Sequence, residues 1–267
     1  MIARASLLVA LLGGATTAFA TCPTPEAGRV DIYPTARVLP ENLLRVYVYY
    51  PRAMAASAGL SDIQLLDADG TPMDGVFLPT REDLWSQDRR RLTVLMDPGR
   101  VKTGLESSEA MGRALRSGQS YTLAVSGASL DAAGCVLGQN TAVSFQVGPP
   151  DFDPPDPSEW VLSVPKAGSR DPLLVDLGSP YDHLSLAFRL RILDAEGSIV
   201  PGQIGLSPDE DGWEFTPRAP WMAEAYSLAI EDSLEDLAGN RPGALFDRPS
   251  GQAPEPWLNR LAFQPGA

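Results

Sequence analysis

The chain has 267 residues and a formal net charge of −13, with 44% hydrophobic and 21% charged residues. This is the composition of a globular protein, and its strong negative charge argues against nucleic acid and anionic membrane surfaces as main partners. The 25 prolines and 24 glycines are typical of an all-β protein with many turns.

The first twenty residues have the three-part pattern of a secretory signal peptide. The apolar run Leu7–Leu12 is followed by small residues and by Ala18-Phe-Ala20, so residues 1–20 are predicted to be cleaved after Ala20. The run is too short to span a bilayer, and no other stretch predicts a transmembrane segment. Lipid attachment at Cys22 is the alternative, although Thr21 and Phe19 are poor flanking residues for it. We therefore expect an exported protein, located in the periplasm or outside the cell.

Cys22 and Cys135 are the two cysteines of the chain. In an oxidising compartment two such residues are expected to form a disulfide. Closing a loop of more than a hundred residues would contribute about 4–5 kcal/mol in the chain-entropy model. The alternatives are two unpaired thiols, or a Cys22 reserved for lipid.

The chain repeats itself. Residues 121–134 (YTLAVSGASLDAAG) align with residues 226–239 (YSLAIEDSLEDLAG). Upstream, Leu66-Asp-Ala-Asp-Gly70 matches Leu193-Asp-Ala-Glu-Gly197, and downstream Phe145-Gln146 matches Phe263-Gln264. Because the three pairs keep the same order, the two halves are predicted to be copies of one domain. The first copy has extra residues between the first two blocks, and the second copy has extra residues between the last two. These insertions are where we expect the copies to have specialised.

The repeated blocks predict strands and turns. Leu44, Val46, Val48 and Tyr50 alternate with polar or aromatic residues, as expected for a strand. Each copy has about seven such segments, the number expected of an immunoglobulin-like sandwich. The sequence thus predicts an all-β protein of two tandem immunoglobulin-like β-sandwiches, the first with a short inserted helix from about Glu106 to Ser117. The expected domains are residues 22–148 and 159–267, joined by a Pro-rich, semi-rigid linker at 149–158.

Three motifs together resemble a known family. These are a Leu-x-Val-x-aromatic strand, an Asp-x-x-Gly turn, and a Tyr-x-Leu-x-Val strand that leads to Asp-x-Ala-Gly-Asn. The last motif is matched best by Asp236-Leu-Ala-Gly-Asn240, whereas Cys135 replaces the Asn in the first copy. The pattern is similar to bacterial immunoglobulin-like domains of the surface-layer-protein type. Such domains act as spacers, adhesion modules and accessory domains, so the resemblance implies no catalytic residues and no cofactor.

The residues themselves supply no catalytic or metal constellation. His183 is the single histidine, no Gly-x-Ser-x-Gly motif accompanies it, and we expect it in a turn or on the surface. With two cysteines that are expected to be bridged, no common zinc site can be assembled. Asp67-Ala-Asp-Gly70 is interpreted as a hairpin turn, because the acids of a calcium loop do not follow it.

The most interesting surface combines Trp85 with Asp97, Arg100 and Lys102. Trp and Arg are favoured binding anchors, and functional residues tend to lie on loops held by a rigid scaffold. The alternative is structural: Trp85 covers the end of the sandwich and Arg100 caps a carboxylate or a chain end.

These observations favour a non-enzymatic binding or structural module with an unknown protein or glycan partner. The alternatives are an enzyme or enzyme-accessory protein that acts on extracellular polymers, or a pure spacer. A cleft with convergent polar groups would favour the enzyme, and an exposed apolar or aromatic patch would favour the binding module.

Overall fold

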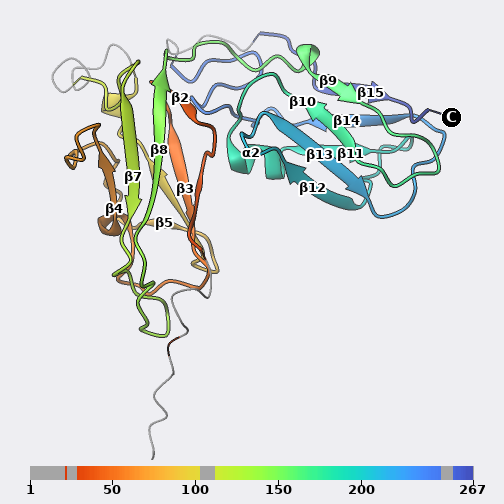
Figure 1. Ribbon diagram of the computed structural model, residues 1–267. Coiled ribbons are helices and arrows are strands. Elements are labelled where there is room, and N and C mark those ends of the chain that lie inside the picture. Colours follow the sequence, from red (N-terminus) through yellow and green to blue (C-terminus); the bar gives the residue numbers. More distant parts are fainter. Residues whose placement is uncertain (1–21, 23–28, 103–111, 248–254, 267) are drawn as a thin grey trace, which may run out of the picture.

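The computed structural model describes residue 22 and residues 29–102, 112–247 and 255–266. The predicted signal peptide therefore lies outside the described residues. The chain forms two β-sandwiches, each with its own buried core. Figure 1 shows the first sandwich standing upright and the second extending sideways from its upper half.

The first sandwich consists of two four-stranded sheets. One has the order β1-β3-β6-β5 and the other the order β2-β8-β7-β4. All neighbouring strands are antiparallel except β2 and β8, which are parallel. The strands are β1 (Asp31–Tyr33), β2 (Val38–Pro40), β3 (Arg45–Tyr49), β4 (Ile63–Leu66), β5 (Leu84–Trp85), β6 (Arg91–Leu95), β7 (Ser120–Val125) and β8 (Thr141–Gly148).

The second sandwich repeats this order. Its sheets are β9-β10-β13-β12 and β11-β14-β15. A parallel bridge from Lys166 to Gly266 stands where β2 pairs with β8 in the first sandwich. The strands are β9 (Val161–Ser163), β10 (Leu173–Asp176), β11 (Leu190–Leu193), β12 (Gly202–Leu206), β13 (Gly212–Pro217), β14 (Tyr226–Ile230) and β15 (Arg260–Phe263).

Two features identify both sandwiches as immunoglobulin-like. The strand order matches the division of that fold into one sheet of its first, second, fourth and fifth strands and another of the remainder. Both sandwiches also have a tyrosine corner at the start of the sixth strand of the fold, which is β7 in the first sandwich and β14 in the second. The Arg116 amide donates to the Tyr121 hydroxyl at 3.2 Å, and the Met222 amide donates to the Tyr226 hydroxyl at 3.1 Å. The predicted fold class is confirmed.

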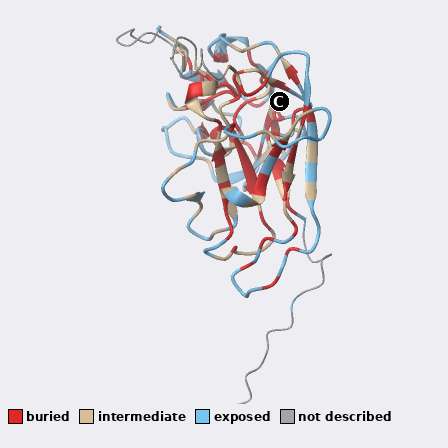
Figure 2. Ribbon diagram, turned by 90° about the vertical axis from the view of Figure 1, so that its left-hand side faces the viewer, coloured by how far each residue is buried: buried red, intermediate tan, exposed pale blue. Residues whose placement is uncertain are grey.

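The cores follow the alternation of the strands. In β3 the side chains of Val46 and Val48 point between the sheets, as do Leu173 and Val175 of β10. Trp213 and Trp221 are almost fully buried in the second core. Figure 2 shows the buried strands at the centre of the molecule and the exposed loops at its periphery.

The helical segments differ from the expectation. Half of the helix predicted from Glu106 to Ser117 falls on residues 106–111, which lie outside the described residues. Residues 112–117 are not helical: they form bends and a turn that place Ala114 and Leu115 in the core. The sequence analysis missed α2 (His183–Phe188), which begins where the Asp182 carboxylate accepts a hydrogen bond from the Ser185 amide at 2.9 Å. Single turns of 3₁₀ helix occur at η1 (Leu60–Asp62), η2 (Pro98–Arg100) and η3 (Pro157–Glu159).

Candidate functional site

Each sandwich has one end built from three loops that contact one another. In the first sandwich these loops are residues 50–62, 86–90 and 126–140, which we call the first loop end. In the second sandwich they are the described residues of the equivalent loops, 177–189, 207–211, 231–247 and 255–259, which we call the second loop end. They connect equivalent pairs of strands in the two sandwiches.

The same backbone hydrogen bonds join the loops of both loop ends. The Met54 amide donates to the Arg89 carbonyl, and the Tyr181 amide donates to the Glu210 carbonyl, both at 3.0 Å. In the same way the Ala55 amide donates to the Leu130 carbonyl at 3.0 Å, as the Asp182 amide does to the Glu235 carbonyl at 3.1 Å. Arg89 and Glu210 also share a positive φ, 53° and 61°, the two such cases among the described residues other than glycine.

Four of the five Asp-x-x-Gly motifs fold as one kind of turn, the exception being Asp209-Glu-Asp-Gly212, whose glycine is the first residue of β13. The Asp side chain accepts from the amides two and four residues later, and the Gly amide donates to the Asp carbonyl. The glycine has a φ of 80° or 81° in each, which only glycine adopts without strain. The four turns begin at Asp67, Asp131, Asp194 and Asp236.

The equivalent loop ends differ in exposure. Every residue from Leu234 to Asn240 in the second loop end is buried, and within this stretch Glu235, Leu237 and Gly239 contact the first sandwich. The matching turn of the first loop end exposes Leu130 and residues 132–134. The second loop end is therefore an internal contact of the chain, and the first is a free surface of the described residues.

A polar network joins the second loop end to β3. The Tyr47 hydroxyl donates to the Asp182 carboxylate at 2.8 Å, and the Arg45 guanidinium forms an ion pair with Glu235. Arg241 donates to the same Glu235 carboxylate at 2.6 Å. Burial, followed by the charge of Asp182, raises the pKa of Tyr47, so its hydroxyl stays a proton donor. Buried ion pairs of this kind fix the orientation of the elements that they join, and removing one partner leaves the other charge buried without a partner.

His183 lies in the same contact rather than on the surface, which corrects the expectation for this residue. Its ring stacks on Tyr33 with 3.8 Å between centroids, and its Nδ1 lies 2.6 Å from the Glu210 carboxylate. The other oxygen of Glu210 accepts from the Thr35 amide at 3.0 Å. One histidine and one buried glutamate thus connect β1 to the second loop end.

Two asparagines fix the linker. Asn42 donates to the Asp151 carbonyl at 2.7 Å and accepts from the Asp151 amide at 2.8 Å. Asn240 donates to the same carbonyl from the other side at 3.2 Å. A backbone bond of 2.9 Å from the Leu44 amide to the Leu237 carbonyl lies beside them. The linker is therefore bound to both sandwiches at one residue.

The two insertions meet at this junction. Lys102, from the insertion of the first copy, places its Nζ 4.4 Å from the ring centroid of Phe246, from the insertion of the second. A Cβ at Gly239 would lie 2.5 Å from the Leu44 side chain, whereas one at Gly134 would meet nothing. The junction thus combines a contact between the two insertions with a close approach at Gly239, which belongs to the shared pattern of the two copies.

The structure separates the residues that the sequence singled out for binding. Trp85 packs on Tyr50 with 5.4 Å between centroids and carries the Arg89 guanidinium over its ring at 4.7 Å. It pairs with the start of β6, whereas Asp97, Arg100 and Lys102 follow the other end of β6. Trp85 is therefore not brought together with the other three.

Asp97 and Arg100 are engaged within the first sandwich. The Asp97 carboxylate accepts from the Gly99 amide at 2.8 Å and caps η2. Arg100 donates to the carbonyls of Asp74 and Gly75, each at 3.2 Å, and to that of Gly112 at the same distance. Arg100 is thus bound to backbone carbonyls of neighbouring loops.

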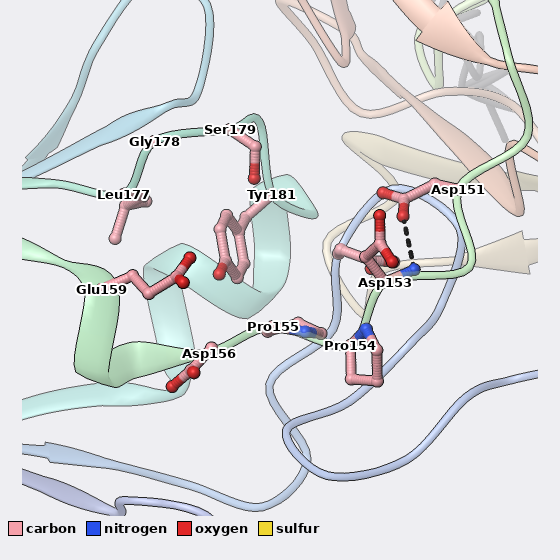
Figure 3. A pocket seen from close by; sticks show the side chains of 11 residues that line it. Asp151, Asp153, Pro154, Pro155, Asp156, Glu159, Leu177, Gly178, Ser179 and Tyr181 are labelled. Atoms are coloured by element: carbon pink, nitrogen blue, oxygen red, sulfur yellow. Dashed lines mark hydrogen bonds between the residues drawn. The ribbon is translucent and has the colours of Figure 1, made fainter.

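An acidic pocket of about 360 Å³ opens along the linker. Figure 3 shows Asp156 and Glu159 on one side of Tyr181, with Asp151 and Asp153 across from them. Asp236, which is buried, also lines the pocket. No group of three or more acids, histidines or cysteines within the described residues is placed to hold a metal ion.

The equivalent aspartates of the two loop ends have opposite electrostatic surroundings. Burial, followed by the charge of Asp151, raises the pKa of Asp236 to about 7. Burial alone would also raise the pKa of Asp131, but the amides of Cys135 and Ala133 and the Arg52 guanidinium, at 2.6 Å, hold it below its ordinary value. One copy of the turn therefore has a cation beside its carboxylate, and the other has a second carboxylate.

The first loop end carries the disulfide. Cys22 is bonded to Cys135, as the sequence predicted, and this bond ties the N-terminal segment to the turn at 131–135. One sulfur cannot hold both this bond and a lipid. Beside it, Leu130 and Val136 form a cross-strand pair, 38% and 53% exposed. Their equivalents in the second loop end are Glu235 and Arg241, which form an ion pair.

Sequence reasoning missed the junction residues. Arg45 and Tyr47 lie between the apolar positions of the alternating strand, and their partners lie in the other sandwich. The sequence does contain a difference between the two copies in these loops. Asp182, Glu210 and Glu235 of the second copy stand where the first copy has Ala55, Arg89 and Leu130. None of the helices that the structure describes is long and apolar enough to cross a membrane.

No protein family matches the chain, and no curated protein does. Among solved structures it is similar to a chimeric titin Z1Z2 (10% identity; 74% of this chain and 86% of that one; TM-score 0.25). It is also similar to native alpha-2-macroglobulin from Escherichia coli, domains MG0-NIE-MG1 (7%; 90% and 70%; TM-score 0.28). A third is the Ig1-2 module of the Drosophila receptor protein tyrosine phosphatase DLAR (12%; 78% and 93%; TM-score 0.23). At these scores the assignment of the fold depends on the strand order and tyrosine corners described above.

Proposed function

We propose that the chain is an exported, non-enzymatic binding or structural module whose two sandwiches are held as one body. The observation that carries this proposal is the contrast between equivalent surfaces: the second loop end is buried on the first sandwich, and the first loop end is free. A polar junction that fixes orientation serves to present a surface, and an exposed apolar pair beside arginines is suited to a partner.

We propose the periplasm or the cell exterior as its location. The disulfide supports an oxidising compartment, and the predicted signal peptide supports export. The motif ending at Asn240 supports the surface-layer-protein type of immunoglobulin-like domain and a duplicated origin of the two sandwiches. The partner is then a protein or a glycan of that compartment. The acidic pocket is the one observation that favours the alternative of an enzyme, because it gathers carboxylates beside Asp236, whose pKa is raised.

A photo-crosslinker at Val136 tests the proposed surface in the native host. The matched control places it at Ile199, which is 63% exposed on the hairpin after β11 of the second sandwich. We expect defined crosslinked species from position 136 and none from position 199. Equal patterns at both positions would contradict a role for the first loop end.

Trp85, Asp97, Arg100 and Lys102 remain proposed binding residues. The double variant Trp85→Ala plus Arg100→Ala is expected to weaken partner capture and to keep the fold. Loss of the folded state, measured by circular dichroism, would show that their internal contacts are their function.

A further inference from the structure

We infer that the first loop end binds the outer face of the β9-β10-β13-β12 sheet of a second copy of this chain, in a head-to-tail manner. This inference rests on the proposed function and names the partner. It follows from the equivalence of the two sandwiches, because the chain already contains one such contact. Within the chain, the second loop end binds the outer face of the β1-β3-β6-β5 sheet of the first sandwich.

The corresponding face of the second sandwich is unoccupied in the described chain. The strand registers place Leu174 where Tyr47 lies, Ser163 where Tyr33 lies, and Pro172 where Arg45 lies. Leu174 is 45% exposed, and Val161 beside it on β9 is 62% exposed. Tyr47, by contrast, is buried beneath the second loop end.

The residues that would meet across the new contact are matched in polarity. Within the chain, Glu235 meets Arg45 and Asp182 meets Tyr47. Their equivalents are Leu130 against Pro172, and Ala55 against Leu174. Both of these pairs are thus replaced on both sides by apolar groups, whereas Glu210, which accepts from the Thr35 amide, has Arg89 as its equivalent in the first loop end. Had only one side changed, a buried charge would be left without a partner.

The shape of this face agrees with the contact. A groove of about 520 Å³ runs over the face and is lined by Ser163, Leu174, Asp176 and Glu214, among others. An apolar centre with a polar rim is the usual arrangement of a protein interface.

The contact is heterologous, since two different surfaces meet. It does not close a two-fold dimer, so each copy keeps one free loop end and one free sheet face. Repetition continues the tandem array of sandwiches from copy to copy. The disulfide from Cys135 to Cys22 and the hydrogen bond from Asn240 to the linker are made from the same position of the two equivalent turns.

The test uses two variants of the full mature chain, Leu130→Glu and Leu174→Glu, with Ile199→Glu as the matched control. Sedimentation velocity is recorded from about 1 µM to about 500 µM, the range of weak protein contacts. The wild type and the control are expected to form species larger than a dimer as concentration rises. Each of the two other variants is expected to remain monomeric, with an unchanged circular dichroism spectrum.

Mixing the two monomeric variants separates this geometry from other modes of association. Leu130→Glu keeps an intact sheet face and Leu174→Glu an intact loop end, so an equimolar mixture is expected to give a dimer and nothing larger. A wild type that stays monomeric, or a mixture that stays monomeric, overturns the inference. If position 136 still crosslinks to another molecule in the host, the proposed function stands and only the second copy as its partner is wrong.

Discussion

The turns at 131–135 and 236–240 have the same backbone and opposite uses. Both have an Asp that accepts two amides and a Gly with φ near 80°. At the last position, Cys135 binds the N-terminal segment covalently, whereas Asn240 binds the linker through hydrogen bonds. One turn is exposed and balanced by Arg52; the other is buried beside Asp151. The same kind of turn therefore binds Cys22 in the first sandwich and the linker in the second. The residues around the turn determine whether the loop end is exposed or covered.

The largest effect is expected when the disulfide between Cys22 and Cys135 is removed. Cys135→Ser should reduce the free energy of unfolding by about 4 kcal/mol, because the bond closes a loop across 113 residues. Chemical denaturation with and without reductant measures this loss. Reductant should have no further effect on the variant, and an equal loss in the variant with reductant would point to a cause other than the disulfide.

Removing the hydrogen bonds of Asn240 should reduce the free energy of unfolding by a smaller amount. Asn240→Ala removes the bonds to the Asp151 carbonyl, the Asp236 carboxylate and the Phe246 amide, for about 2–3 kcal/mol. Unlike Cys135→Ser, it should also loosen the linker. Hydrogen exchange at the Asp151 amide reports this directly, and unchanged protection there would show that Asn42 alone fixes the linker.

The two aspartates should respond to pH with opposite signs. Asp236 has a raised pKa in the folded state, so the folded protein binds more protons and loses stability as pH rises from about 4 to about 7. Asp236→Asn keeps the turn amides satisfied, loses one bond from Asn240, and removes that slope. Above pH 7 it should therefore melt higher than the wild type.

Asp131 has a lowered pKa, so its stabilisation is present above the ordinary carboxyl pKa and is lost as pH falls through the folded value. Asp131→Asn should cost about 1–3 kcal/mol at neutral pH by leaving Arg52 without its acceptor. Melting curves of both variants between pH 4 and pH 8 give the comparison. The same sign for both at pH 8 would contradict the assigned surroundings.

The smallest effects concern the glycines. Gly134→Ala should cost about 1 kcal/mol, because it strains a positive φ in open space. Gly239→Ala adds a close approach to Leu44 across the junction, so its cost should exceed that of Gly134→Ala. The difference in melting temperature between the two variants isolates the contribution of the junction.

Much of the fold could be predicted from local patterns. Alternation at Val46 and Val48 indicates a core strand, Asp-x-x-Gly indicates its turn, and export indicates a disulfide. These features depend on neighbouring residues or on compartment. The helix expected at 106–117 rests on a capping-box motif, on apolar spacing and on Gly118 as its end, whereas the described residues 112–117 are not helical and place Ala114 and Leu115 in the core.

The junction could not be predicted because its partners are far apart in the chain. Arg45 and Glu235 are each ordinary surface residues by sequence, and nothing local indicates that they meet. His183 looked isolated because its contacts, Tyr33 and Glu210, come from different sandwiches or loops. The equivalence of the two loop ends becomes visible only when their backbone bonds are compared.

The central claim is that the second loop end is docked and that the two sandwiches move as one body. Backbone amide relaxation, measured by NMR on Leu130→Glu to keep the protein monomeric, tests it most directly. The account predicts one rotational diffusion tensor for the amides of both sandwiches, which should split into two after a further Arg45→Ala substitution. Two separate, faster correlation times for the sandwiches without that substitution would contradict the claim.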